Sequence, residues 1–334
     1  ASNDATIKVW AHDAYETKGP LRGTLYNGHS SGIVKLSGDD SYLVSIDSYS
    51  TKVWNRRNGT PILSIPKGGQ DVNVAGKYVL VASSTVINVL DRDTGDDVRV
   101  LQGHDYQVNC IYTSSSIVVS GDSSGKVKMW DVEKGEELKT FEGQTGGINA
   151  VALDGTHVLS GGDDYTAKLW DRESGEEVLT LNHENYIYAV AMNENIILTG
   201  GYDNNVRIWE RSSGTMQRIL QGHASPIYAL AVDTAHVVSG SSDKTVRVWD
   251  LRTGAWLRTL EGHTSDVKGL MLDDTTIISA SNDASIMEWQ IMRENQLRLL
   301  RRAALRCSSN FDEGSCRDLL DVLSEVVPSF ADIS

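Results

Sequence analysis

One short pattern recurs along the chain about every 40 residues, and a tryptophan closes it seven times. These tryptophans are Trp10, Trp54, Trp130, Trp170, Trp209, Trp249 and Trp289, and Leu90 holds the same position in an eighth copy. The intervals between the eight anchors are 44, 36, 40, 40, 39, 40 and 40 residues. A period of this length indicates a repeat protein in which each copy is one small supersecondary unit. Such units bury a core only by stacking on their neighbours.

The copy that ends at Trp249 shows what each unit contains. Residues 227–232, 236–240, 245–249 and 256–260 are short apolar or β-branched runs, separated by clusters of Gly, Ser, Asp and Asn. Runs at this spacing predict four antiparallel strands. In six copies a glycine follows the anchor by five residues, where a tight turn needs a residue that tolerates positive φ. These are Gly59, Gly95, Gly135, Gly175, Gly214 and Gly254. Radial stacking of such small sheets protects their edges, so the sequence predicts an all-β propeller.

Two dipeptides mark a known family. Gly-His opens four copies, at Gly28-His29, Gly103-His104, Gly222-His223 and Gly262-His263. Trp-Asp closes the third strand of three copies, at Trp130-Asp131, Trp170-Asp171 and Trp249-Asp250. In these elements the chain resembles the WD-repeat β-propellers, and its compact repeats are similar to those of F-box/WD-repeat and related adaptor proteins. The resemblance implies four-stranded blades and a role in binding other proteins.

The repeat pattern divides the chain into three parts. Residues 27–300 hold seven complete blades, with residues 296–300 aligned to the outer strand of the last one. Residues 1–26 hold only the third and fourth strands of another blade, so we expect eight blade positions with the first incomplete. The alternative is that the chain begins partway through a repeat of a longer protein. Residues 301–334 leave the pattern and contain amphipathic stretches, which predicts a short C-terminal helical tail.

Histidine, serine or threonine, aspartate and tryptophan recur in phase in three copies. The sets are His183, Thr199, Asp203 and Trp209; His223, Ser239, Asp243 and Trp249; and His263, Ser279, Asp283 and Trp289. A Ser-His-Asp catalytic site serves a single pocket, so three copies in three blades favour a structural role. The resemblance implies a buried hydrogen-bond network that ties together the strands of a blade. Elsewhere Gln144 replaces the histidine and Ser124 replaces the aspartate.

The resemblance also indicates a binding surface on the narrow face, where turns surround the central channel. The positions it marks there are Tyr106, Asp163, Tyr186, Tyr202, Tyr228, Asp266 and Asn282. Four of the seven are tyrosines, which offer a large, stiff contact surface with a polar tip. The alternative is that these tyrosines only cover the rim of the channel. No arginine stands at these positions, which disfavours a site that clamps a phosphorylated peptide.

Charge and cysteine content narrow the classes of partner. The net charge is −14, from 45 acidic and 31 basic residues, which disfavours free nucleic acid and anionic membranes. We expect no membrane insertion, because apolar runs fall short of the roughly 18 residues that a spanning helix needs.

Three cysteines without a CxxC motif, and no signal-peptide pattern, predict a reducing intracellular location, cytoplasmic or nuclear. No metal-ligand spacing or glycine-rich phosphate loop occurs, so we predict no metal, cofactor or small-molecule substrate.

These observations predict a non-enzymatic scaffold or adaptor that binds a protein or peptide within a multisubunit complex. The first alternative is the substrate-recognition subunit of a ubiquitin ligase of the F-box/WD-repeat type, whose ligase-binding domain would lie upstream of this chain. The second alternative is a propeller enzyme. An enzyme would need a deep pocket that holds a carboxylate or histidine of strongly shifted pKa.

Overall fold

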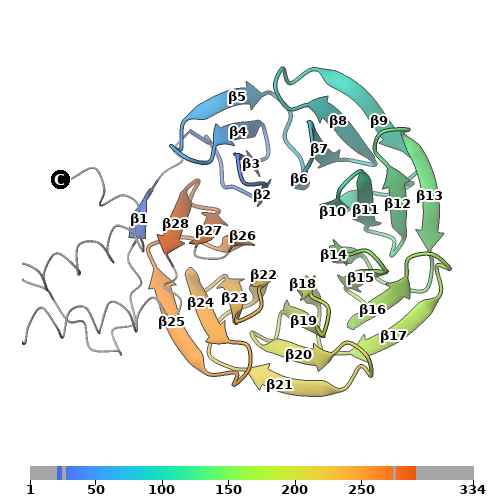
Figure 1. The fold of residues 1–334 in the computed structure, drawn as a ribbon, viewed down its shortest axis with the longest axis vertical. Coiled ribbons are helices and arrows are strands. Elements are labelled where there is room, and N and C mark those ends of the chain that lie inside the picture. The colour runs from blue at the N-terminus through green and yellow to red at the C-terminus, as the bar shows by residue number, and fades with distance from the viewer. Residues whose placement is uncertain (1–20, 25–27, 274–275, 291–334) are drawn as a thin grey trace, which may run out of the picture. The chain divides into compact units, whose positions relative to one another are not determined.

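The computed structural model describes residues 21–24, 28–273 and 276–290. They form a closed ring of seven four-stranded antiparallel sheets, each a blade set radially around a central channel (Figure 1). The ring belongs to a compact unit that spans Thr17–Trp289. The described residues contain no helix. The predicted all-β propeller with seven complete blades is confirmed.

Six blades are continuous in sequence, and each runs from its innermost to its outermost strand. Blade 1 is β2 (Lys35–Gly38), β3 (Tyr42–Ile46), β4 (Thr51–Asn55) and β5 (Pro61–Ile65). Blade 2 is β6 (Asp71–Ala75), β7 (Tyr78–Ser83), β8 (Val86–Asp91) and β9 (Asp97–Gln102). Blade 3 is β10 (Val108–Ser114), β11 (Ile117–Asp122), β12 (Val127–Asp131) and β13 (Glu136–Phe141). Blade 4 is β14 (Ile148–Leu153), β15 (His157–Gly162), β16 (Thr166–Asp171) and β17 (Glu177–Asn182). Blade 5 is β18 (Ile187–Met192), β19 (Ile196–Gly201), β20 (Val206–Glu210) and β21 (Met216–Leu220). Blade 6 is β22 (Ile227–Val232), β23 (His236–Ser241), β24 (Thr245–Asp250) and β25 (Trp256–Glu261).

The seventh blade joins two segments that are far apart in sequence. Its inner strands are β26 (Val267–Leu272), β27 (Thr276–Ser281) and β28 (Ile286–Gln290), and β1 (Leu21–Thr24) pairs with β28 as the outermost strand. This pairing corrects two expectations. β1 is not the outer strand of a separate partial blade, and the position beside β28 that we assigned to residues 296–300 is occupied by β1. The exposed edge of β28 needs hydrogen-bond partners, and β1 supplies them while closing the ring.

The other predicted boundaries of the domain division concern residues that the structure does not describe. Residues 1–20 and 25–26, the remainder of the expected partial blade, and residues 301–334, the expected helical tail, lie outside the described residues. β1 belongs to blade 7 rather than to a separate first part, and the rest of the three-part domain division stays a prediction.

The hydrophobic core lies between adjacent blades as well as within them. Trp130 on β12 packs in one cluster with Leu80 and Ile87 of blade 2. Trp54 on β4 packs with Ile278 of blade 7, across the point where the ring closes. Both tryptophans are 1% exposed. Six anchors share a core cluster in this way with the neighbouring blade, which is why the period persists in the sequence: Trp54, Leu90, Trp130, Trp170, Trp209 and Trp249.

Ion pairs reinforce the contacts between blades. Arg211 in the turn after β20 pairs with Asp154 of blade 4, with Nη1 2.6 Å from Oδ2. This bond to Arg211 and two backbone hydrogen bonds lower the pKa of Asp154 to about 2, against the opposing effect of burial. Arg56 of blade 1 makes the same kind of pair with Asp273 of blade 7 and therefore spans the closure.

The channel is lined by the free edges of the innermost strands. One inward-facing position is small in five blades, where it holds Cys110, Ala150, Ala189, Ala229 and Gly269. The register places Lys35 and Asp71 at this position in blades 1 and 2. The Asp71 carboxylate accepts a hydrogen bond from the backbone N–H of Ile111 in blade 3, at 2.8 Å, and burial raises the pKa of Asp71 to about 6. Blade 2, whose anchor is Leu90 rather than a tryptophan, is thus linked to blade 3 by a hydrogen bond on the channel side.

Candidate interaction face

A buried hydrogen-bond network lies within several blades. In blade 6, Trp249 Nε1 donates to Ser239 Oγ at 3.0 Å, and the ring nitrogens of His223 contact Ser239 Oγ at 2.8 Å and Asp243 Oδ2 at 2.7 Å. Blade 7 repeats these contacts with Trp289, Ser279, His263 and Asp283. The Ser239 and Ser279 side chains are 0% exposed, so a substrate has no access to either hydroxyl. These hydrogen bonds therefore give buried polar groups their partners within each blade.

Blade 5 departs from the expected network. Trp209 Nε1 still donates to Thr199 Oγ1 at 2.8 Å, but His183 reaches neither Thr199 nor Asp203. Arg207 Nη2 lies 2.5 Å from Asp203 Oδ2 and takes the carboxylate that pairs with histidine in blades 6 and 7. Nε2 of His183 is buried and has no partner among the described residues. Burial, followed by the nearby Arg207, lowers the pKa of His183 to about 4.

Blades 1 and 3 complete the network with a carboxylate that the sequence analysis missed. His104 Nδ1 contacts Asp122 Oδ2 at 2.7 Å, and His29 Nδ1 contacts Asp47 Oδ2 at 2.9 Å. Blade 3 therefore keeps its aspartate, and Ser124 instead donates to Asp122 from within the turn. The signal was in the sequence, because both aspartates follow their histidines by 18 residues rather than 20.

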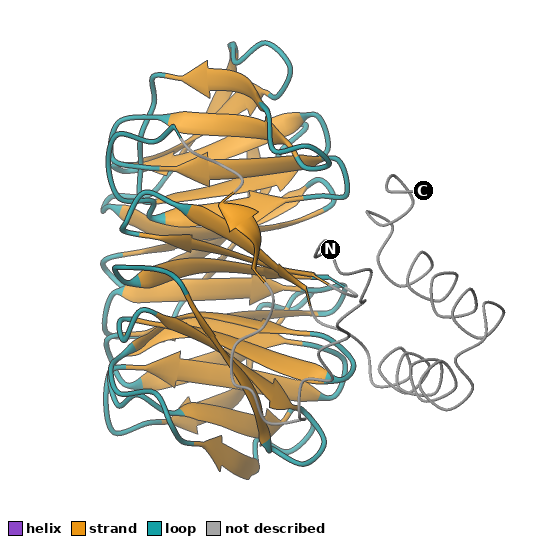
Figure 2. Cartoon of the chain, turned by 90° about the vertical axis from the view of Figure 1, so that its left-hand side faces the viewer, coloured by secondary structure: helices purple, strands orange, loops and turns teal. Residues whose placement is uncertain are grey.

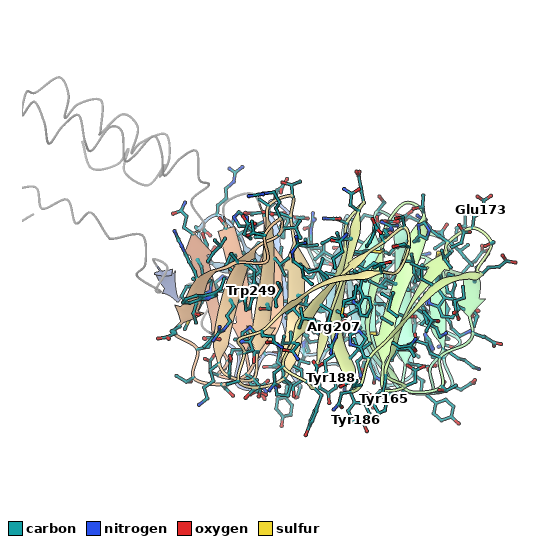
Figure 3. The ribbon with its side chains drawn as sticks, turned by 90° about the horizontal axis from the view of Figure 1, so that it is seen from below. Tyr165, Glu173, Tyr186, Tyr188, Arg207 and Trp249 are labelled. Carbon is teal, nitrogen blue, oxygen red and sulfur yellow. The ribbon has the colours of Figure 1, made fainter. Side chains whose placement is uncertain are left out.

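Five tyrosines form a continuous group on one face, which we call the tyrosine arc: Tyr165, Tyr186, Tyr188, Tyr202 and Tyr228. The ring centroids are 5.2 Å apart for Tyr165 and Tyr186, and 6.3 Å apart for Tyr186 and each of Tyr188 and Tyr202. The arc continues into blade 6, where Tyr228 stacks on Tyr188 at 5.3 Å. Figure 3 shows Tyr165, Tyr186 and Tyr188 together at one face of the ring, with Glu173 at the opposite face.

Local structure explains how separate repeats contribute to the arc. Tyr165 and Tyr202 lie in the turns between the second and third strands of blades 4 and 5. Tyr186 immediately precedes β18, and Tyr188 and Tyr228 are the second residues of β18 and β22. In an antiparallel blade these two chain segments lie at the same end of the strands, and in blade 5 the Tyr202 N–H donates to the Tyr186 carbonyl at 3.0 Å. Figure 2 shows the disc from the side, with loops along both of its faces. Tyrosines that are far apart in sequence therefore meet.

The arc includes three of the seven positions marked by the resemblance, Tyr186, Tyr202 and Tyr228. Tyr106 is 57% exposed and has no ring contact with the arc. The backbone N–H of Asn282 donates to the Asp266 carbonyl at 3.0 Å. The sequence analysis missed Tyr165 and Tyr188, although Tyr188 and Tyr228 follow their anchoring histidines by the same five residues.

A carboxylate lies near each end of the arc. Near Tyr228, Lys268 Nζ is 3.0 Å from the ring centroid and 3.6 Å from Asp266 Oδ2. Burial lowers the pKa of Lys268. Burial also raises the pKa of Tyr228, and the negative charge of Asp266 raises it further. At the other end, Asn149 Nδ2 donates to Asp163 Oδ1 at 2.6 Å. A hydrogen bond with Tyr165, and more weakly the charge of Asp163, raises the pKa of Tyr186.

The central channel contains a cavity of about 420 Å³, and Tyr228 and Lys268 are among the residues that line it. In blades 4 to 6 it is lined mainly by small apolar side chains. Among the described residues, no group of three or more His, Cys, Asp or Glu side chains is arranged to hold a metal ion. The described ranges also contain no helix long and apolar enough to cross a bilayer.

Gly201 packs closely against the backbone of Tyr186, one of the residues of the arc. A Cβ at Gly201 would overlap the carbonyl oxygen of Tyr186, whereas a Cβ at Gly155 would have no neighbour within 4 Å. We expect Gly201→Ala to cost about 2–3 kcal/mol of unfolding free energy, because the β18 backbone must move, and to displace Tyr186. Urea denaturation and near-ultraviolet circular dichroism measure the two effects. Equal stability of Gly201→Ala and the control Gly155→Ala would contradict this prediction.

The seven radial four-stranded sheets define the chain as a β-propeller. Residues 95–131, 135–171, 175–210, 214–250 and 254–290 match the WD40 family, described as "WD domain, G-beta repeat", and the chain belongs to that family. WD40 propellers are typically non-enzymatic scaffolds.

The proteins that the chain resembles include one natural relative and one designed protein. It is 37% identical over 57 residues to the WD repeat-containing protein 55 homolog of Dictyostelium discoideum. That match covers 16% of this chain and only 14% of the relative. The crystal structure of the computationally designed Ika8 protein superimposes with a TM-score of 0.65 at 26% identity, and covers 80% of this chain and 98% of the designed one. Both likenesses concern the repeat and its fold.

Proposed function

We propose that the protein is an adaptor that binds a peptide segment of a partner protein across the tyrosine arc, within a multisubunit complex in a reducing compartment. The observation that carries this proposal is the continuity of the arc over three adjacent blades. Tyr165, Tyr186 and Tyr202 expose 43%, 38% and 54% of their surfaces. Contiguous exposed aromatic surface is typical of interaction sites, where tyrosine is enriched among the residues that dominate affinity.

The packing within the arc suits it to binding. Each ring is held by at least one other ring, so a partner would order few additional side chains on binding. Covering the channel rim does not require tyrosine. Asn109 and Asn149 occupy the same strand position in blades 3 and 4, where their side chains donate to the carbonyls of Ile148 and Ile187, both at 3.1 Å. The tyrosines therefore provide surface beyond what closing the rim needs.

The ubiquitin-ligase alternative rests only on the style of the repeats, and no described residue favours it over other adaptors. An enzymatic role lacks support from the buried serines, whose hydroxyls are sealed inside the blades.

The proposal can be tested with a phage-displayed library of random 12-residue peptides. We expect the wild-type protein to enrich a defined set of peptides. The double variant Tyr186→Ala/Tyr202→Ala should bind them at least about 30-fold more weakly, which is the effect of losing one tyrosine hot spot of about 2 kcal/mol. The control is Tyr49→Ala, since Tyr49 is 71% exposed in the corresponding turn of blade 1, outside the arc. No enrichment, or equal binding by the arc variant, would overturn the proposal.

A further inference from the structure

The two ends of the tyrosine arc differ in how their carboxylates are neutralised. At the Tyr228 end, the chain's own Lys268 lies over the ring at 3.0 Å and beside Asp266 at 3.6 Å. An ammonium group between an aromatic face and a carboxylate satisfies both, because the ring quadrupole and the negative charge attract it together. This end of the arc is therefore already filled by a cation from blade 7.

The other end of the arc, which we call the Tyr186 end, consists of Tyr165, Tyr186 and Tyr202. It also has aromatic faces and a carboxylate, but no cation from the described residues lies between them. Tyr165 and Tyr202 stand against Tyr186 at interplanar angles of 57° and 88°, so the three exposed rings form walls rather than a flat surface. Asp163 lies in the turn two residues before Tyr165, and its carboxylate is held by Asn149. In the described part of the chain, Asp163 forms no ion pair.

Three of the four loops around this end contain acidic side chains. Residues 143–147, 162–165, 183–186 and 201–205 contain four acidic side chains and no lysine or arginine. Two of the acids have internal partners, because Asp203 pairs with Arg207 and Asp164 accepts a hydrogen bond from the Thr145 backbone at 2.9 Å. Asp163 and Glu184 remain without a cationic partner among the described residues.

Resting on the proposed function, we infer that the Tyr186 end of the arc binds a lysine or arginine side chain of the partner segment. The cation lies against the rings of Tyr165, Tyr186 and Tyr202, and Asp163 and Glu184 attract it. This arrangement reproduces, with a side chain from outside, the contact that Lys268 makes at the other end. The net charge of −14 also steers basic segments toward the protein.

The test uses the enriched peptides and two matched variants. Asp163→Asn/Glu184→Gln removes both charges, while the amide oxygen that replaces one carboxylate oxygen of Asp163 can still accept a hydrogen bond from Asn149. Glu173→Gln makes the same chemical change at the opposite face (Figure 3). Fluorescence polarisation would compare each labelled peptide with its version in which every lysine and arginine is glutamine, at 50 mM and 500 mM salt.

We expect the enriched peptides to contain lysine or arginine and to bind Asp163→Asn/Glu184→Gln about tenfold more weakly, with no change for Glu173→Gln. Their glutamine versions should lose affinity and salt sensitivity together. Peptides that depend on Tyr186 and Tyr202 but lack basic residues, or that ignore the charge variant, would overturn this inference and leave the proposed function intact. Absence of any arc-dependent peptide would overturn both.

Discussion

A chain that begins at Gly28 is expected to be less stable than one that begins at Leu21 by about 3 kcal/mol or more. The longer chain contains β1, which pairs with β28 in a register that sets Leu21 opposite Trp289 and Thr24 opposite Met287. Without β1, blade 7 has three strands, and the edge of β28 loses several backbone hydrogen bonds worth about 1 kcal/mol each. Trp289, which is 1% exposed, also loses the strand beside it.

Urea denaturation of the two truncated chains and of the full chain measures this effect. The chain that begins at Leu21 controls for the removal of residues 1–20. We also expect the shorter chain to self-associate in size-exclusion chromatography, because an unpaired edge strand is a template for another chain. Arg56 and Asp273 still bridge blades 1 and 7 in both truncations, so any difference reports on β1. Coincident denaturation midpoints would mean that β1 does not close the ring.

Removal of one buried hydroxyl is expected to lower the free energy of unfolding more in blade 3 than in blade 5. Ser120 Oγ lies 2.8 Å from Trp130 Nε1 and 2.7 Å from His104 Nε2. Ser120→Ala therefore leaves two buried ring nitrogens without partners, at about 1–3 kcal/mol each, and we expect a total loss near 4 kcal/mol. Thr199 serves only Trp209 Nε1, at 2.8 Å, so Thr199→Val should cost about half as much.

Both substitutions remove a hydroxyl and little volume, which makes them a matched pair. Chemical denaturation gives the two losses of unfolding free energy, and the order of the losses is the decisive result. Equal losses would show that His104 draws no stability from Ser120. Such a result would also remove the main reason for treating the recurring polar residues as a stabilising network.

Local periodicity was enough to predict the blades. Alternating apolar strands, a turn glycine and a tryptophan every 40 residues or so report on contacts within one repeat and with the adjacent one. The networks of blades 6 and 7 follow the same logic, because their His, Ser, Asp and Trp recur at constant spacing. Prediction failed at Asp122, where the carboxylate approaches His104 from a position two residues earlier, and at His183, where Arg207 competes for Asp203.

The repeated pattern was enough to predict a propeller of tryptophan-anchored blades, since that information recurs within each unit. How the ring closes and which tyrosines meet became visible only in the folded structure. Both depend on segments distant in sequence: β1 finds β28 across more than 260 residues, and Tyr165, Tyr188 and Tyr228 come from three blades. Such contacts follow from the curvature of the closed ring, which no single repeat encodes. The anchors specify the scaffold, and the arc arises where residues that do not repeat are brought to one face.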